Sequence, residues 1–107
     1  MNHSYLQQDI KLNLKRVERG VLFLFQRPGG GLVQVMQSWL GIHILLSRLR
    51  KNRTYCAKDV PLLVWKEEEQ LHVKFHVPEE LVVEECAFSG EETARILTML
   101  EELPSWN

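Results

Sequence analysis

The residues that could do covalent or acid–base chemistry are few, and they form no established motif. Two cysteines, Cys56 and Cys86, stand thirty positions apart, which matches neither a disulfide framework nor a zinc-binding pair. The chain has no Gly-x-Ser-x-Gly elbow, Cys-x-x-Cys pair, His-Glu-x-x-His motif or Gly-x-Gly-x-x-Gly fingerprint. A cysteine beside a histidine can act as nucleophile and base, but free cysteine is more often a small buried apolar residue. We therefore expect no catalytic residue, no cofactor and no metal, and a protein that is not an enzyme.

Positively charged residues are the strongest candidates for a binding site. Residues 48–55 form the densest cluster of bases and end on an aromatic residue. Lysine and arginine can contact phosphates while an aromatic ring stacks on a base, so this pattern favours nucleic-acid binding. The alternative is a solvated helix end whose cations complement the helix dipole. The residues expected to bind nucleic acid are Lys11, Lys15, Arg16, Arg48, Arg50, Lys51, Arg53 and Tyr55.

The two halves of the chain carry opposite charge. Ten bases and two acids precede Asp59, giving +8, whereas three bases and twelve acids from Asp59 onward give −9. This asymmetry can indicate an anionic partner for the basic half. It can also mean that the halves fold against each other, or pair between the subunits of a homodimer. Only the folded arrangement distinguishes these interpretations.

Three further patterns are weak indications of a site. Three glycines at 29–31 resemble a phosphate-binding loop, but no lysine and hydroxyl residue follow at the required spacing, so a turn is the better interpretation. Glu67–Glu69 suits a solvated turn, because neighbouring strand residues point to opposite sides and cannot share a cation. His72 and His76 lie about 13 Å apart along an extended strand, too far to chelate one metal.

Hydrophobic periodicity predicts the secondary structure. Alternating residues indicate half-buried strands at 10–15 and 71–77, and the apolar run 21–25 indicates a central strand buried on both faces. Gly20 is expected in a hairpin turn that requires a positive backbone angle. Residues 32–37 fit either a strand or the start of a helix. A helix is expected from the N-cap Ser38 to about Asn52, although Gly41 weakens it.

The second half, from Pro61 to Trp106, has the more regular pattern. Residues 62–65 and 71–77 predict a hairpin, Pro78–Glu80 a turn and residues 81–88 another strand. Ser89 and Glu92 have capping-box spacing, and Pro104 is expected to end the helix that follows. The closing Trp106 is expected to pack back onto the fold.

These elements predict one α+β domain over residues 1–107, with the order β-β-(β)-α-β-β-β-α. We expect a single antiparallel sheet of about five or six strands with two helices packed on one face. The absence of an export signal or a spanning apolar segment predicts a cytoplasmic protein with no membrane partner. The leading hypothesis is a small regulatory or accessory protein that binds nucleic acid. The alternative is a protein-interaction module, as a homodimer or adaptor.

Overall fold

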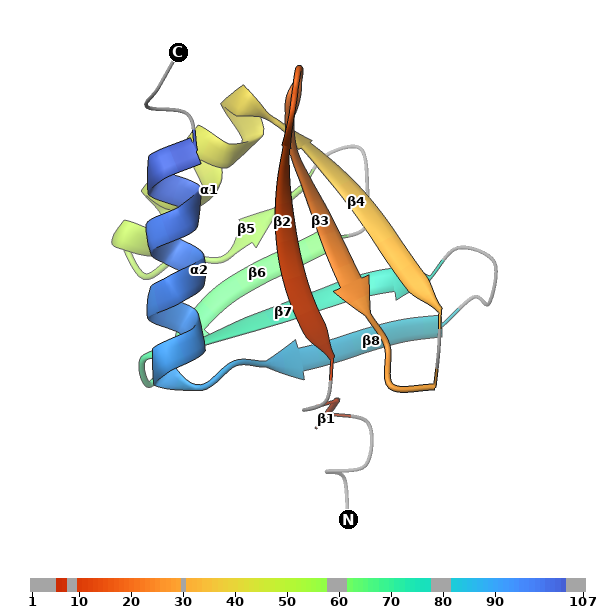
Figure 1. The fold of residues 1–107 in the computed structure, drawn as a ribbon. Coiled ribbons are helices and arrows are strands. Elements are labelled where there is room, and N and C mark those ends of the chain that lie inside the picture. The colour runs from red at the N-terminus through yellow and green to blue at the C-terminus, as the bar shows by residue number, and fades with distance from the viewer. Residues whose placement is uncertain (1–5, 8–9, 30, 58–61, 78–81, 104–107) are drawn as a thin grey trace.

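Two β-sheets face each other, and two helices close one side of the space between them (Figure 1). The computed structural model describes residues 6–7, 10–29, 31–57, 62–77 and 82–103. The strands are β1 (Leu6–Gln7), β2 (Lys11–Val17), β3 (Gly20–Gln26), β4 (Leu32–Ser38), β5 (Tyr55–Cys56), β6 (Leu62–Glu67), β7 (Gln70–Val77) and β8 (Val82–Ala87); the helices are α1 (Trp39–Arg50) and α2 (Gly90–Glu102).

The first sheet is an antiparallel meander in the order β2-β3-β4. β2 alternates as the sequence predicts, and in β4 the inner side chains are buried and the outer ones exposed. The apolar run in β3 does not mean burial on both faces, because Leu22 and Leu24 on the outer face are only half-buried. β3 is the central strand of its sheet, as expected, but the expectation of burial on both faces was wrong. Residues 32–37, ambiguous in the sequence, form a strand.

The second sheet has the order β1-β8-β7-β6-β5, and only the β1–β8 pair is parallel. The predicted hairpin is confirmed as β6 and β7, which are joined by Glu68 and Glu69. Both of these residues have positive φ, at 54° and 67°, as a two-residue turn of the primed type requires. The three glutamates therefore lie at an exposed tip, as expected.

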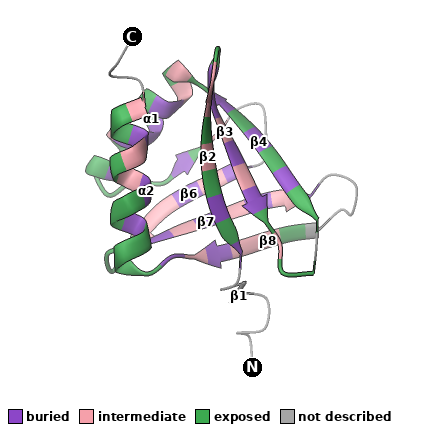
Figure 2. Cartoon of the chain, in the orientation of Figure 1, coloured by how far each residue is buried: buried purple, intermediate pink, exposed green. Residues whose placement is uncertain are grey.

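The core lies between the inner faces of the two sheets. Phe25 of β3 stacks on Phe75 of β7, with ring centroids 4.2 Å apart. Fully burying such side chains contributes about 1.5–3 kcal/mol each to folding. Figure 2 shows the buried residues alternating along the strands, while the outer side of α2 is exposed. Each sheet therefore hides the apolar face of the other.

The two helices begin at the predicted serines. The hydroxyl of Ser38 accepts a hydrogen bond from the Gly41 N–H, and that of Ser89 accepts one from the Glu92 N–H. In a full capping box the Glu92 carboxylate would accept from the Ser89 N–H. It accepts instead from the Arg95 guanidinium in an ion pair, which lowers the pKa of Glu92. Ile96 and Leu100 of α2 are buried in the core, as expected.

The α+β class is confirmed, but the single sheet of five or six strands is wrong. The described residues form one sheet of three strands and one of five, and two strands of only two residues, β1 and β5, alter the predicted order. The helices do not cover a sheet face, because each inner face is already covered by the other sheet. Instead α1 and α2 contact each other beside the sandwich, where α1 also meets both sheets.

Several expectations lie outside the described residues. These are the turn at Pro78–Glu80, the helix end at Pro104 and the packing of Trp106. No helix in the described ranges is both long and apolar enough to cross a membrane.

Gly20 serves a close approach of two strands and not the turn expected of it. It begins β3 opposite Ser38, and a Cβ added there would overlap the backbone carbonyl oxygen of Gln37. We predict that Gly20→Ala lowers the free energy of unfolding by about 2–3 kcal/mol, because this backbone cannot move aside cheaply. Gly29→Ala is the matched control, since nothing lies within 4 Å of its added Cβ. Equal urea midpoints for the two variants would contradict the role given to Gly20.

Candidate functional site

The eight residues expected to bind nucleic acid do not form one surface. Lys11 and Lys15 are exposed on β2, and the Arg16 guanidinium lies over the Trp39 ring, 5.4 Å from its centroid. Arg50 pairs with Glu101 of α2 at 3.3 Å. Three of the eight, Arg48, Lys51 and Arg53, line one hollow, and Tyr55 lines an adjoining groove with Arg48.

These three cations surround a hollow at the end of α1. The hollow has a volume of about 280 Å³ and is lined by His43, Ile44, Ser47, Arg48, Lys51 and Arg53. The chain reverses here because Asn52 adopts a positive φ of 57°. The Arg53 N–H then donates to the Arg48 carbonyl, 2.9 Å away. This turn places Arg53 beside bases that precede it in the helix.

Tyr55 cannot stack on a base, contrary to the interpretation of the sequence. Its ring is buried, with 6% of the residue exposed. Its hydroxyl donates a hydrogen bond to Oε1 of Gln37, 2.5 Å away. Burial, and to a smaller extent the neighbouring Cys56, raises the pKa of Tyr55. The residue is therefore part of the scaffold of the site.

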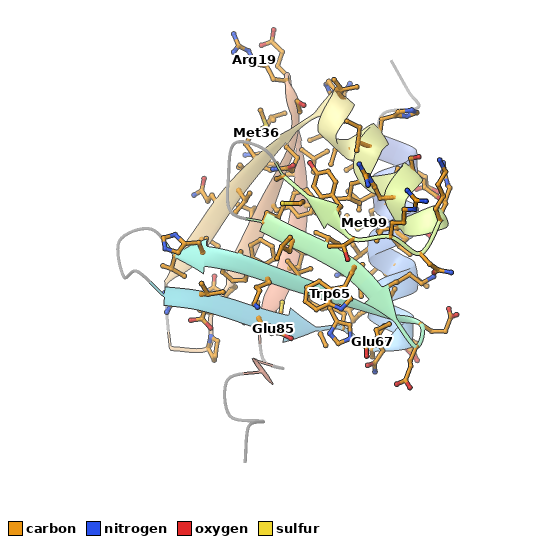
Figure 3. All side chains as sticks on the ribbon, turned by 180° about the vertical axis from the view of Figure 1, so that it is seen from behind. Arg19, Met36, Trp65, Glu67, Glu85 and Met99 are labelled. Carbon is orange, nitrogen blue, oxygen red and sulfur yellow. The ribbon has the colours of Figure 1, made fainter. Side chains whose placement is uncertain are left out.

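A larger groove adjoins the basic hollow and lies between β4, α1 and β5. Its volume is about 480 Å³, and its lining residues are Met36, Gln37, Ser38, Leu40, Gly41, Ile44, Arg48, Tyr55, Cys56 and Ala57. Ile44 and Arg48 line both cavities, so the groove and the hollow are continuous. Figure 3 labels Met36 on β4, which lies across the groove from Cys56 of β5.

The groove exposes large apolar side chains. Leu40 is 68% exposed, Met36 40% and Ile44 39%. Leu40 and Ile44 are four residues apart, and therefore on one face of α1. The core residues of this helix are others: Ile42, Leu45, Leu46 and Leu49. This second apolar face of α1 was not predicted from the sequence, although the i, i+4 spacing of Leu40 and Ile44 indicates it.

Gln37 forms the floor of the groove. Its side chain is buried, its Oε1 accepts from Tyr55, and its Nε2 donates to the Met36 carbonyl at 2.8 Å. A Cβ added at Gly41 would lie 3.2 Å from the Tyr55 hydroxyl oxygen and 3.4 Å from Oε1 of Gln37. Glycine within α1 therefore makes room for this buried polar pair. The pair links β4 to β5, which belong to different sheets.

Bases of the first half of the chain form ion pairs with acids of the second half. Arg27 donates to Glu84 at 3.0 Å in a partly buried ion pair, and Arg50 pairs with Glu101. The halves therefore fold against each other, and part of the charge asymmetry is used internally. No ion pair joins Arg48, Lys51 or Arg53 to an acid within the described part of the chain.

The described cysteines and histidines lie in separate surroundings. Neither cysteine is in a disulfide; Cys56 is exposed, whereas burial, and then Glu85 and Glu84, raises the pKa of Cys86 to about 12. His72 stacks on Trp65, with ring centroids 5.3 Å apart, and Figure 3 shows Trp65 on the outer face of the larger sheet. No cluster of three or more His, Cys, Asp or Glu side chains suited to a metal occurs among the residues described.

We predict that the Gln37–Tyr55 hydrogen bond couples the stability of the two sheets. Tyr55→Phe should lower the free energy of unfolding by about 1–3 kcal/mol, because it leaves a buried acceptor on Gln37 unpaired. Gln37→Met should cost a similar amount by leaving the Tyr55 hydroxyl unpaired. The double variant should lose less than the sum, with a coupling energy of about 1 kcal/mol in urea denaturation. Strict additivity would show that the bond contributes nothing.

The geometry combines an apolar groove, a buried polar pair beneath it and three cations in the adjoining hollow. Polar groups held under an apolar lining can orient a bound molecule. Comparison of the chain with protein-family models, with curated proteins and with solved structures found no match.

Proposed function

We propose that this protein is a small, non-enzymatic interaction module that binds a partner protein in the groove between β4, α1 and β5. The observation that carries the proposal is the exposure of Leu40 at 68%, beside Met36 and Ile44, in an open cavity of about 480 Å³. Large apolar side chains gathered in a concave surface are typical of sites that bind other molecules. A single exposed leucine needs no such explanation, but Met36, Leu40 and Ile44 all line the same groove.

The surroundings of the groove support binding rather than catalysis. The cations Arg48, Lys51 and Arg53 add a polar rim, as protein interfaces have around an apolar centre. A homodimer that pairs basic and acidic halves between subunits is less favoured, because Arg27 and Arg50 already pair with Glu84 and Glu101 within one chain.

We predict that peptides can be selected on this groove. A phage-displayed random library of about twelve residues suits it, because an extended peptide of that length spans about 40 Å and is long enough to cross a cavity of about 480 Å³. Peptides selected on the native protein should bind Leu40→Gln/Ile44→Gln about tenfold more weakly, since losing two apolar contacts costs about 1.4 kcal/mol. Titration calorimetry measures the change.

The matched control for this test is Val83→Gln. Val83 is 54% exposed, and it lies on β8, which contributes no residue to the groove. Its replacement should leave peptide affinity within about twofold of the native value. The proposal fails if no peptide is enriched, or if the selected peptides bind the groove variant and the native protein equally well.

Nucleic-acid binding is the second candidate function, and the convergence of Arg48, Lys51 and Arg53 favours it. Three bases around one hollow can contact successive phosphates of a single strand. Neither Lys11 nor Lys15 lines this hollow, and Tyr55 offers no exposed ring. A nucleic-acid site here would thus contain fewer residues than the sequence suggests, and it would not explain the apolar groove.

For this candidate we predict binding of a labelled single-stranded oligonucleotide at low salt, measured by fluorescence anisotropy. Three phosphate contacts give a slope of about −2 in a plot of log K against log salt. Charge reversal at Arg48, Lys51 and Arg53 should abolish binding, whereas reversal at Lys11 and Lys15 should not. No increase in anisotropy at low salt, or an equal loss of affinity in both sets of variants, would rule out nucleic-acid binding in the hollow.

A further inference from the structure

The free edge of β4 faces away from β3 and carries backbone hydrogen-bonding groups. The Trp39 N–H donates to the Arg19 carbonyl and the Arg27 N–H to the Gly31 carbonyl, one at each end of the β3–β4 ladder. In an antiparallel pair every second residue bonds to the neighbouring strand, so the residues of β4 that bond to β3 are the odd-numbered ones. The backbone groups of Gln34 and Met36 consequently point to the opposite edge.

Across the groove, β5 offers a second edge. The Ala57 N–H donates to the Leu62 carbonyl at 3.0 Å, and Tyr55 is the partner of Val64 in the ladder with β6. By the same alternation, the N–H and C=O of Cys56 point away from β6. Met36 and Cys56 both line the groove. Strand edges from both sheets thus lie at one cavity, although the Met36 carbonyl already accepts a hydrogen bond from Nε2 of Gln37.

Charge around this cavity selects for an anionic occupant. Arg48 lines the groove itself, and Lys51 and Arg53 line the adjoining hollow. Among the residues that the structure describes, no acidic side chain lines either cavity. In the described ranges none of the three cations has an ion-pair partner in the chain. Complementary charge on a partner would supply the missing counterparts.

We propose that the groove binds an extended, acidic segment of a partner protein, which adds a strand to the edge of β4. The inference rests on the proposed protein-binding function and specifies its ligand class. Backbone groups of the segment pair with the N–H and C=O of Gln34 and with the N–H of Met36, whose carbonyl is already held by Gln37. Cys56 offers its backbone groups from β5. Alternate side chains of a strand point to opposite faces, so an apolar residue meets Leu40 and Ile44 where the chain enters the groove. Acidic residues beyond it reach Arg48, Lys51 and Arg53.

A nucleic acid fits these features less well. Phosphates would satisfy the three cations, but single-strand binding relies on exposed aromatic rings for stacking, and Tyr55 is buried under the groove. Apolar side chains and strand edges instead match the way in which extended peptides are recognised by β-strand addition. A strand edge left open is itself a template for such pairing.

The test uses the peptide most enriched in the library selection on the native protein. It is synthesised unmodified and with N-methyl groups on alternate amides in each of the two registers. Backbone pairing predicts that one register of methylation weakens binding at least tenfold, whereas the other has a smaller effect, because β5 contributes only Cys56. Binding of the unmodified peptide should slow hydrogen exchange of the Gln34, Met36 and Cys56 amides at least tenfold. The Val35 amide is the internal control, because it already faces β3.

The charge of the selected peptides tests the acidic character. Enriched sequences should carry Asp or Glu, and Arg48→Glu/Lys51→Glu/Arg53→Glu should bind them at least tenfold more weakly. The matched variant Lys11→Glu/Lys15→Glu should stay within twofold, since it alters charge on β2, the far edge of the small sheet.

The outcomes separate the two proposals. Peptides that depend on Leu40 and Ile44 but bind as helices or leave the Met36 and Cys56 amides unprotected would keep the interaction module and overturn strand addition. Peptides that depend on Leu40 and Ile44 but are basic would overturn the acidic ligand class. Tolerance of N-methylation in both registers would overturn strand addition in the same way. A selection without groove-dependent peptides overturns both. Competition by a single-stranded oligonucleotide for the unmodified peptide, lost on reversal of the three cations, would replace the acidic segment by nucleic acid.

Discussion

Gln37 is the residue on which the arrangement of the two sheets depends most directly. Its side chain joins the carbonyl of Met36 to the hydroxyl of Tyr55, while its own backbone carbonyl occupies the space that a side chain at Gly20 would need. A buried amide must have its partners, because leaving one unpaired costs about 1–3 kcal/mol. The positions of β4, β5 and α1 are therefore fixed together, through glycines at Gly20 and Gly41.

The same constraint keeps the molecule open on one side. A buried hydrogen bond between side chains holds β4 and β5 near each other, but no backbone ladder joins them. The sheets meet through their apolar faces, represented by the stack of Phe25 on Phe75, and not through their edges. Strand edges left free are a liability unless they are covered or used. The groove is the direct consequence of packing two sheets without closing them.

Much of the secondary structure could be predicted from the sequence, because alternation and capping are local properties. The strands at 10–15, 21–25 and 71–77 and the caps at Ser38 and Ser89 are confirmed. The division into two sheets could not be predicted, since a period of two identifies a buried face but not the surface that buries it. The residues of the candidate site were harder still to predict from the sequence. The turn at Asn52 gathers three of the predicted bases, and burial of Tyr55 depends on Gln37, eighteen residues earlier.

The cations without a partner in the described residues and the exposed apolar side chains of α1 lie at the same groove. Ion pairs with the acidic half neutralise Arg27 and Arg50, so the excess of bases in the first half overstates what an external partner would meet. The cations beside the groove have no such partner in the described residues, and beside them α1 keeps a second apolar stripe exposed. A helix gains no folding energy from exposing Leu40 to water. An exposed leucine and uncompensated cations at one cavity are therefore better explained by binding than by folding.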